Sequence, residues 1–230
     1  MSWLGPEEWQ AVVLSLKVAL WATVLSLPLA IAVAYALARG RFWGHGLLNG
    51  LVHLPLVLPP VVTGYLLLIF FGSQGIGGQL LEAIGLPLAF RWTGAVLAAA
   101  IMAFPLVVRA VRLSIEAVDP RLEAAAATLG ASPLRVFFTV TLPMAMPGVL
   151  AGAVLGFAKA MGEFGATITF VSNIPGETQT LPSAVYSFLQ VPGGESAAVK
   201  LVIIAVVVAM GALLLSEWLA RRMARKVSGI

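Results

Sequence analysis

Two ionisable side chains lie inside an apolar stretch that is long enough to cross a membrane. Lys159 and Glu163 are four residues apart, so on a helix they share a face and can form an ion pair. Charged residues in such a stretch are costly and are therefore functional candidates by default. We favour a structural ion pair or an interface contact over a gate, because Glu163 is about 20 residues, or roughly 29 Å, into its stretch and near the end.

The sequence predicts no metal site, no disulfide and no P-loop nucleotide site. Cysteine is absent, and His45 and His53 form no ligand cluster with carboxylates, so neither a disulfide nor a metal site is predicted. No H-E-x-x-H and no convincing Ser/His constellation occurs, which disfavours an intramembrane enzyme. The P-loop motif G-x-x-x-x-G-K-[ST] is also missing. We therefore expect that the chain is not an enzyme, binds no cofactor itself, and borrows its energy from another subunit or from a gradient.

The composition indicates an integral membrane protein. Of the 230 residues, 60% are hydrophobic and only 10% are charged, and the mean hydropathy is +0.99. A soluble domain would carry about 25% charged residues. The net charge of +4 comes from basic residues in short loops beside apolar stretches. That arrangement is typical of membrane topology signals rather than of a nucleic-acid-binding groove, so no nucleic acid is expected as a partner.

About five transmembrane helices follow from the apolar stretches, since about 20 residues cross a bilayer. We expect an all-α fold in which residues 1–230 form a single transmembrane domain. The predicted spans are residues 9–38, 51–72, 93–113, 144–171 and 199–219. The first stretch lacks a basic n-region and a cleavage site, so we interpret it as a retained span that tilts, kinks near Pro28 or runs partly along the interface.

The basic residues predict the orientation of these spans. With an odd number of spans, ten of the fourteen fall on one side of the membrane: Arg39, Arg41, Arg109, Arg112, Arg121, Arg135, Arg221, Arg222, Arg225 and Lys226. By the positive-inside rule this side is cytoplasmic, with the N-terminus outside and the C-terminus inside. The loop at residues 114–143 is then cytoplasmic as well.

The polar segment 119–143 predicts two short helices joined by a hinge. An N-cap followed by proline starts each helix, a glycine stops the first one and a proline ends the second. These signals are, in chain order, Asp119, Pro120, Gly130, Ser132, Pro133 and Pro143. A helix of about 11 residues is marginal by itself, so this pair needs a partner surface.

The same segment resembles the cytoplasmic EAA loop of ABC-importer permeases. The resemblance lies in Glu123-Ala124-Ala125, then Gly130, then Leu142-Pro143. It implies a coupling loop that docks in a cleft of an ATPase subunit, formed by Arg121, Leu122, Glu123, Ala124, Ala125, Gly130, Leu142 and Pro143. The alternative is an amphipathic helix on the lipid surface, which would favour bulkier apolar residues and more lysines.

Two longer segments resemble the permeases of molybdate importers. They are RLEAAAATLGASPLRVFFTVTLP and GEFGATITFVSNIPGETQTLPSAVY, the latter followed by PGGES. The resemblance implies a homodimer in the bacterial inner membrane, two ATP-binding subunits that carry the ATP, and a soluble oxyanion-binding protein outside. It also implies alternating access. Tungstate or sulfate import is an alternative, because sulfate-importer permeases are similar at GEFGA, and a gradient-driven carrier without an ATPase is another.

Such a permease needs a watery path lined by neutral hydrogen-bond donors, because bare charges do not cross hydrocarbon. The candidates for this path or its gate are Thr63, Glu163, Thr167, Thr169, Ser172 and Asn173. A stripe of small residues predicts close helix packing, either within the chain or across a two-fold axis between subunits. Its members recur every four residues: Gly148, Gly152, Gly156 and Ala160.

Overall fold

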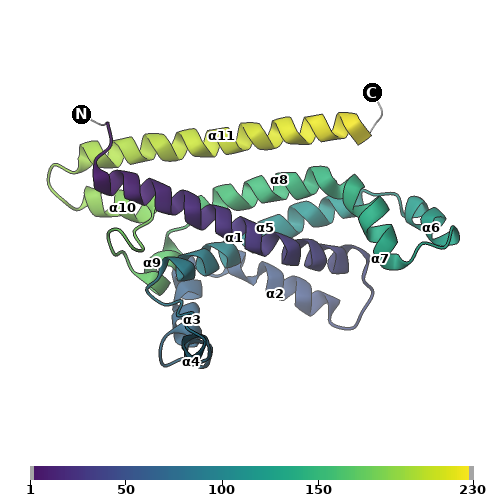
Figure 1. Ribbon diagram of the computed structural model, residues 1–230, viewed down its shortest axis with the longest axis horizontal. Coiled ribbons are helices and arrows are strands. Elements are labelled where there is room, and N and C mark those ends of the chain that lie inside the picture. The colour runs from purple at the N-terminus through teal and green to yellow at the C-terminus, as the bar shows by residue number, and fades with distance from the viewer. Residues whose placement is uncertain (1–2, 228–230) are drawn as a thin grey trace.

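A computed structural model describes residues 3–227, and within this range the chain forms eleven α-helices, one π-helical turn and no strand. In chain order the elements are α1 (Pro6–Arg39), α2 (His45–Val57), α3 (Pro60–Phe71), α4 (Ile76–Ala83), α5 (Trp92–Glu116), α6 (Pro120–Thr128), α7 (Pro133–Val136), η1 (Phe137–Thr141), α8 (Leu142–Met161), α9 (Gly165–Val171), α10 (Leu181–Leu189) and α11 (Glu195–Val227). Their arrangement is shown in Figure 1.

Four stretches of helix are long and apolar enough to cross a membrane: Pro6–Arg39, Trp92–Glu116, Pro133–Met161 and Glu195–Leu219. A fifth candidate is the pair α2 and α3, which passes the same test only when its two bent halves are taken together. The prediction of an all-α membrane protein with about five spans is therefore confirmed.

Two predicted spans are broken rather than continuous. The helix expected over 51–72 is bent by 113° between α2 and α3. Pro59 and Pro60 explain the bend, because each lacks an N–H and disfavours helical backbone in the residue before it. The span expected over 144–171 is interrupted between α8 and α9, at residues 162–164. In contrast, α1 runs without a break through Pro28.

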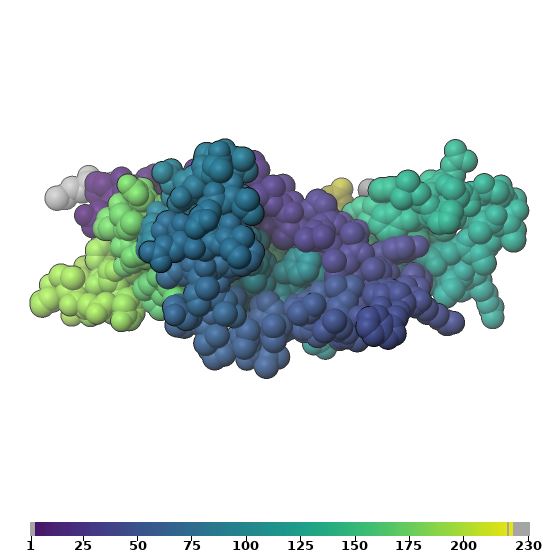
Figure 2. Space-filling view, turned by 90° about the horizontal axis from the view of Figure 1, so that it is seen from below, coloured from purple at the N-terminus to yellow at the C-terminus, as the bar shows by residue number. Residues whose placement is uncertain are grey.

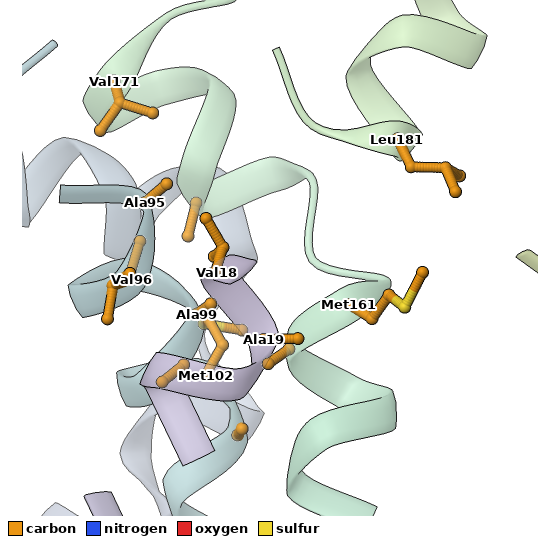
Figure 3. Packing of buried hydrophobic residues seen from close by; sticks show 14 of the residues in the cluster. Val18, Ala19, Ala95, Val96, Ala99, Met102, Met161, Val171 and Leu181 are labelled. Atoms are coloured by element: carbon orange, nitrogen blue, oxygen red, sulfur yellow. The ribbon is translucent and has the colours of Figure 1, made fainter. Parts of the chain in front are cut away.

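The core lies between α1, α5 and α8 and is built largely from small side chains. Ala19 of α1 lies beside Ala99 and Met102 of α5 in one cluster, with Met161 of α8 on its other side (Figure 3). Apolar burial alone supplies little association energy in lipid, so close approach through alanine and glycine is the effective way to pack such helices.

The predicted stripe of small residues lies against α5 of the same chain. A Cβ atom on Gly156 would come within 2.6 Å of Val107 Cγ2, and one on Gly152 within 3.3 Å of the Val107 carbonyl oxygen. Gly148 faces Ser114 in the same way, and Ala160 is buried. The structure thus uses this stripe for packing within the chain.

Two segments stand out from the helical bundle. The α3–α4 segment projects from its flank, and α6 with α7 forms a separate tip at one end (Figures 1 and 2). The C-terminal ends of α1 and α11 lie toward the same end as this tip, whereas α10 lies at the opposite end (Figure 1).

Candidate functional site

The sequence signals around α6 and α7 act as predicted at the helix starts. The Asp119 side chain accepts a hydrogen bond from the Arg121 backbone N–H at 2.9 Å. The Ser132 hydroxyl accepts one from the Arg135 N–H at 3.4 Å, and a proline occupies the first turn of both helices. Gly130 follows α6 with φ of +83°, the left-handed conformation that a glycine stop requires.

The predicted end of the second helix at Pro143 is wrong. After α7 the chain continues through the π-helical turn η1 directly into α8, and Pro143 lies in the first turn of α8. In the π turn the Leu142 N–H bonds to the Phe137 carbonyl, five residues back. The wider turn accommodates a proline ring and its missing N–H without ending the helix. Segment 133–161 is therefore one long, locally widened helix.

The tip formed by α6 and α7 exposes apolar side chains. Leu129 is 88% exposed and Leu134 is 69% exposed, and Leu122 and Phe138 are also exposed. No side chain of α6 is buried. Because large apolar groups gain by leaving water, this face, which we call the tip face (Leu122, Leu129, Leu134 and Phe138), fits a surface that binds a partner.

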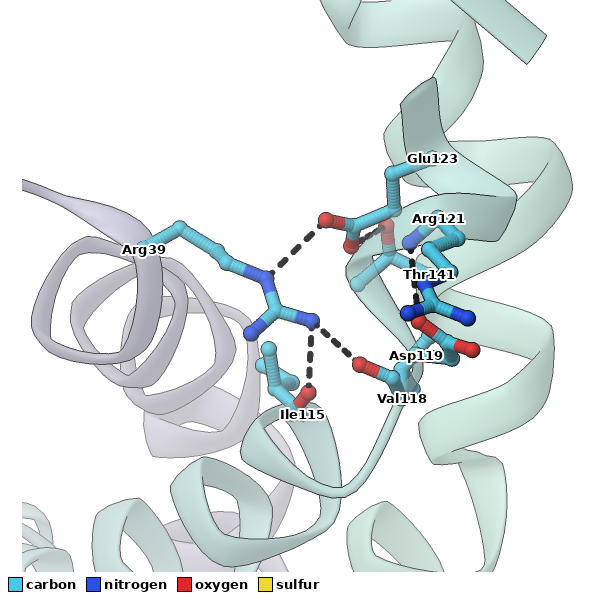
Figure 4. A network of polar contacts seen from close by, with 7 residues as sticks. All are labelled: Arg39, Ile115, Val118, Asp119, Arg121, Glu123 and Thr141. Carbon is cyan, nitrogen blue, oxygen red and sulfur yellow. Dashed lines mark hydrogen bonds and ion pairs between the residues drawn. The ribbon is translucent and has the colours of Figure 1, made fainter. Parts of the chain in front are cut away.

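Glu123 does not belong to the tip face. One of its carboxylate oxygens accepts a hydrogen bond from Arg39 Nε at 3.0 Å, and the other accepts one from the Thr141 hydroxyl at 2.7 Å (Figure 4). The resemblance to the EAA loop implied that Glu123 docks in a cleft of an ATPase subunit together with Leu122, Ala124 and Ala125. The structure turns its carboxylate toward Arg39 and Thr141, whereas Leu122 beside it is exposed (Figure 4).

The remaining residues of the predicted coupling loop are also partly exposed and partly buried. Arg121, Ala124 and Ala125 are exposed on α6, while Leu142 is partly buried against the core cluster near the tip. Pro143 is exposed at the start of α8. Sequence reasoning used Arg39 only as a signal of membrane orientation and did not single out Thr141. Arg39 is a basic residue at the end of a span, and nothing local indicates a carboxylate partner 84 positions away.

The expected ion pair at the end of α8 is present. Lys159 Nζ lies 2.7 Å from Glu163 Oε2, and the Glu163 side chain is only 1% exposed. The other oxygen of Glu163 accepts a hydrogen bond from the Ala166 N–H at 3.0 Å, in the first turn of α9. Glu163 therefore holds the break between α8 and α9 in place from both sides.

The candidate path residues lie in two places. Thr167 and Thr169 are on α9, and their hydroxyls donate to the carbonyls of Phe164 and Gly165 in the same segment. Helix α3 crosses α9 at close range. A Cβ atom added to Gly64 would lie 2.9 Å from both Ala166 Cα and Thr169 Cβ.

Thr63 is next to this crossing. It is buried, and its hydroxyl has no hydrogen-bond partner among the described residues.

Ser172 and Asn173 follow the end of α9 and are separate from the crossing. Ser172 is exposed and has a positive φ of 66°, which is unfavourable for a residue with a side chain. The Asn173 amide donates to the Ser187 hydroxyl of α10 at 2.6 Å, while its oxygen has no partner in the described part of the chain. Within residues 3–227 no group of three His, Asp or Glu side chains is placed to hold a metal ion.

The comparisons with known proteins agree with this architecture. The family profile described as "Binding-protein-dependent transport system inner membrane component" matches residues 26–228. The molybdenum transport system permease protein ModB of Escherichia coli K12 is 60% identical over 219 residues, covering 95% of this chain and 96% of that protein. ModB of Haemophilus influenzae is 59% identical over 221 residues, covering 96% of both.

The fold also matches solved structures. A chain in the crystal structure of a bacterial ABC transporter involved in the import of the acidic polysaccharide alginate superimposes with a TM-score of 0.74, over 95% of this chain and 80% of that one. At 18% identity this likeness concerns the fold alone. The predicted resemblance to importer permeases is confirmed, and the chain belongs to the family of binding-protein-dependent transport system inner membrane components.

Proposed function

We propose that this chain is the permease subunit of an ATP-driven importer that brings molybdate into the cytoplasm. The assignment of molybdate as the transported anion rests on the 60% identity, over 95% of the chain, to a protein named as a molybdenum transport permease. The observation that supports ATP coupling is the tip face, an exposed apolar surface of the segment from α6 to η1 that has no partner in the described chain.

The assembly in this proposal has two copies of the chain, two ATP-binding subunits and a soluble oxyanion-binding protein on the outer side. The chain itself binds no cofactor, and ATP is hydrolysed on the partner subunits. The tip faces the cytoplasm, with the N-terminus outside, because the basic residues concentrate in the loops at this end. Binding of the tip face to the ATPase would then move α6 when nucleotide binds.

The path for the anion runs, in this proposal, past the crossing of α3 and α9. A doubly charged oxyanion needs hydrogen-bond donors along its way, and the Thr63 hydroxyl, which has no partner among the described residues, can donate without losing a bond to them. Thr167 and Thr169 must first break bonds to the backbone before their hydroxyls can donate. Ser172 and Asn173 would contribute near the outer end, and Glu163 supports the path by holding α9.

The test is reconstitution of the permease with its ATPase and binding protein in vesicles. Molybdate is expected to stimulate ATP hydrolysis and to accumulate inside, and both should stop when the ATPase is omitted. Stronger stimulation by tungstate or sulfate would reassign the cargo. Uptake that follows an ion gradient without the ATPase would replace the importer proposal by a carrier.

Substitution of Gly130 gives a first prediction about the tip. An alanine at φ of +83° costs roughly 1 kcal/mol, so Gly130→Ala should weaken ATPase association about fivefold by distorting the turn between α6 and α7. Apart from Gly130 and its two chain neighbours, no described atom lies within 4 Å of the added Cβ, so a steric clash is not the cause. Gly130→Asn is the matched control, since asparagine tolerates this conformation better. Equal affinity of the alanine variant and the wild type, measured by co-purification titration, would contradict the prediction.

A further inference from the structure

Helix α6 is attached to the bundle by few contacts. None of its side chains is buried, and its main neighbours are η1 and α7. Its first residues follow α5 through a short link, and its last residues pass into the turn at Gly130. The position of α6 relative to the membrane helices therefore depends strongly on the polar contacts of Glu123, whose side chain turns inward (Figure 4).

Arg39 is the centre of these contacts. It is the last residue of α1, and its Nη2 donates to the carbonyl of Ile115 at 3.0 Å and to that of Val118 at 2.8 Å. Ile115 lies in the last turn of α5, and Val118 lies two residues beyond its end, where the carbonyls of a helix terminus need donors from outside the helix. The Ile115 carbonyl also accepts from the Val118 N–H at 3.1 Å, so Arg39 reinforces this turn. The Nε of the same guanidinium donates to Glu123. One side chain thus joins the end of α1, the end of α5 and α6.

Glu123 extends the same connection to α8. Its second oxygen accepts from Thr141, a fully buried residue of the π turn that leads into α8. The Arg39 and Glu123 side chains are only 20% and 17% exposed, so water screens this pair less than an exposed pair. A lysine could supply the charge at position 39, but it lacks the planar set of donors that reaches three acceptors at once.

We propose that Arg39 and Glu123 form a clamp that transmits movement of α6 to α1, α5 and α8. In this view both residues are positioning residues, and Glu123 acts within its own chain rather than as a contact to the ATPase. The inference rests on the proposed function, in which the tip face binds the ATPase. Because Leu122 and Leu129 lie outside the clamp, breaking the clamp should leave ATPase binding intact and impair its coupling to transport.

The experiment compares Arg39→Gln, Arg39→Lys, Glu123→Gln and the double Gln variant in the reconstituted complex. All four should co-purify with the ATPase, while the anion imported per ATP hydrolysed falls several-fold. The double variant should be no worse than the more severe single variant, because both substitutions break the same clamp. Arg39→Lys should rescue only partly. Arg221→Gln is the control, since it removes an even shorter ion pair, at 2.6 Å, that lies exposed within α11 alone.

A second measurement tests the clamp independently of the proposed function. In the permease without ATPase, Arg39→Gln should raise the amide hydrogen exchange of residues 120–128 and leave that of α11 unchanged. Unchanged exchange, or normal coupling in both Arg39→Gln and Glu123→Gln, would overturn the clamp. So would loss of ATPase association by Glu123→Gln alone, because Glu123 would then be an ATPase contact. If Arg39→Gln raises the exchange but the wild-type complex shows no ATP-driven uptake, the importer proposal fails and the clamp stands.

Discussion

Truncation of Leu129 to alanine is expected to weaken the association of the permease with its ATPase by at least about tenfold. Leu129 is 88% exposed and stands at the end of α6, next to the turn at Gly130. Full burial of a leucine side chain contributes about 1.5–3 kcal/mol, which corresponds to about 10- to 150-fold in affinity. Because the fold itself does not bury Leu129, the thermal stability of the isolated permease should not change.

Leu134 extends the same prediction to the second helix of the tip. It is 69% exposed, so Leu134→Ala should have a similar effect, and the double variant should abolish measurable association. Thr128→Ala is the matched control on α6, because its exposed hydroxyl bonds only to the Ala125 carbonyl of its own helix. Affinity is read from titration of the detergent-solubilised permease with ATPase, and uptake from vesicles.

The lipid-surface alternative for α6 makes the opposite prediction. If the tip face lay on the membrane, Leu129→Ala would reduce binding of a tip peptide to lipid vesicles while leaving ATPase affinity unchanged. The composition of α6 argues against this outcome, since four of its nine residues are alanine and it contains no lysine, whereas a lipid-surface helix favours bulkier apolar residues and lysines. Unchanged ATPase affinity in the double leucine variant would refute the docking surface.

Local signals predicted the architecture of the tip well, since each depends on one or two neighbouring residues. Asp119 and Ser132 cap helices and Gly130 takes the left-handed conformation, as their types require. Pro143 shows where such reasoning fails. A proline ends a regular α-helix, but the π turn at residues 137–141 changes the hydrogen-bond register before it. No single residue in FFTVT signals that change, so the sequence alone favoured a break.

Side-chain direction was harder to predict than helix position. Glu123 lies in the segment that resembles the EAA loop, and only the three-dimensional arrangement reveals that Arg39 and Thr141 occupy both of its oxygens. The partners are 84 and 18 positions away, so no helical periodicity connects them. The Lys159–Glu163 pair was predictable, because a spacing of four on one helix turn is a local rule.

The second large effect is expected at this Lys159–Glu163 pair. Lys159→Gln leaves the Glu163 carboxylate, only 1% exposed, without its counter-charge. Breaking a buried ion pair in this way typically costs about 3–5 kcal/mol, so we expect a strong loss of folded permease from the membrane. Glu163→Gln should cost less, because the Lys159 side chain is 31% exposed and its flexible stem can carry the ammonium toward water.

The double variant Lys159→Gln/Glu163→Gln distinguishes a structural pair from a gate. It removes both charges, keeps side chains of similar length, and leaves an amide oxygen at position 163 that can still accept from the Ala166 N–H. Stability, measured as the thermal midpoint in detergent, should therefore recover toward the wild-type value. Glu217→Gln, in the exposed pair on α11, is the control and should change neither stability nor uptake.

Uptake by the double variant decides the role of Glu163. A structural pair needs only to hold α9 at the end of α8, so transport should recover together with stability. A charged gate needs the carboxylate itself, so a variant that is stable and assembled with ATPase but inactive would place Glu163 in the path. We expect recovery, because both oxygens of Glu163 are already engaged by Lys159 and the start of α9, which leaves the carboxylate little freedom to open and close.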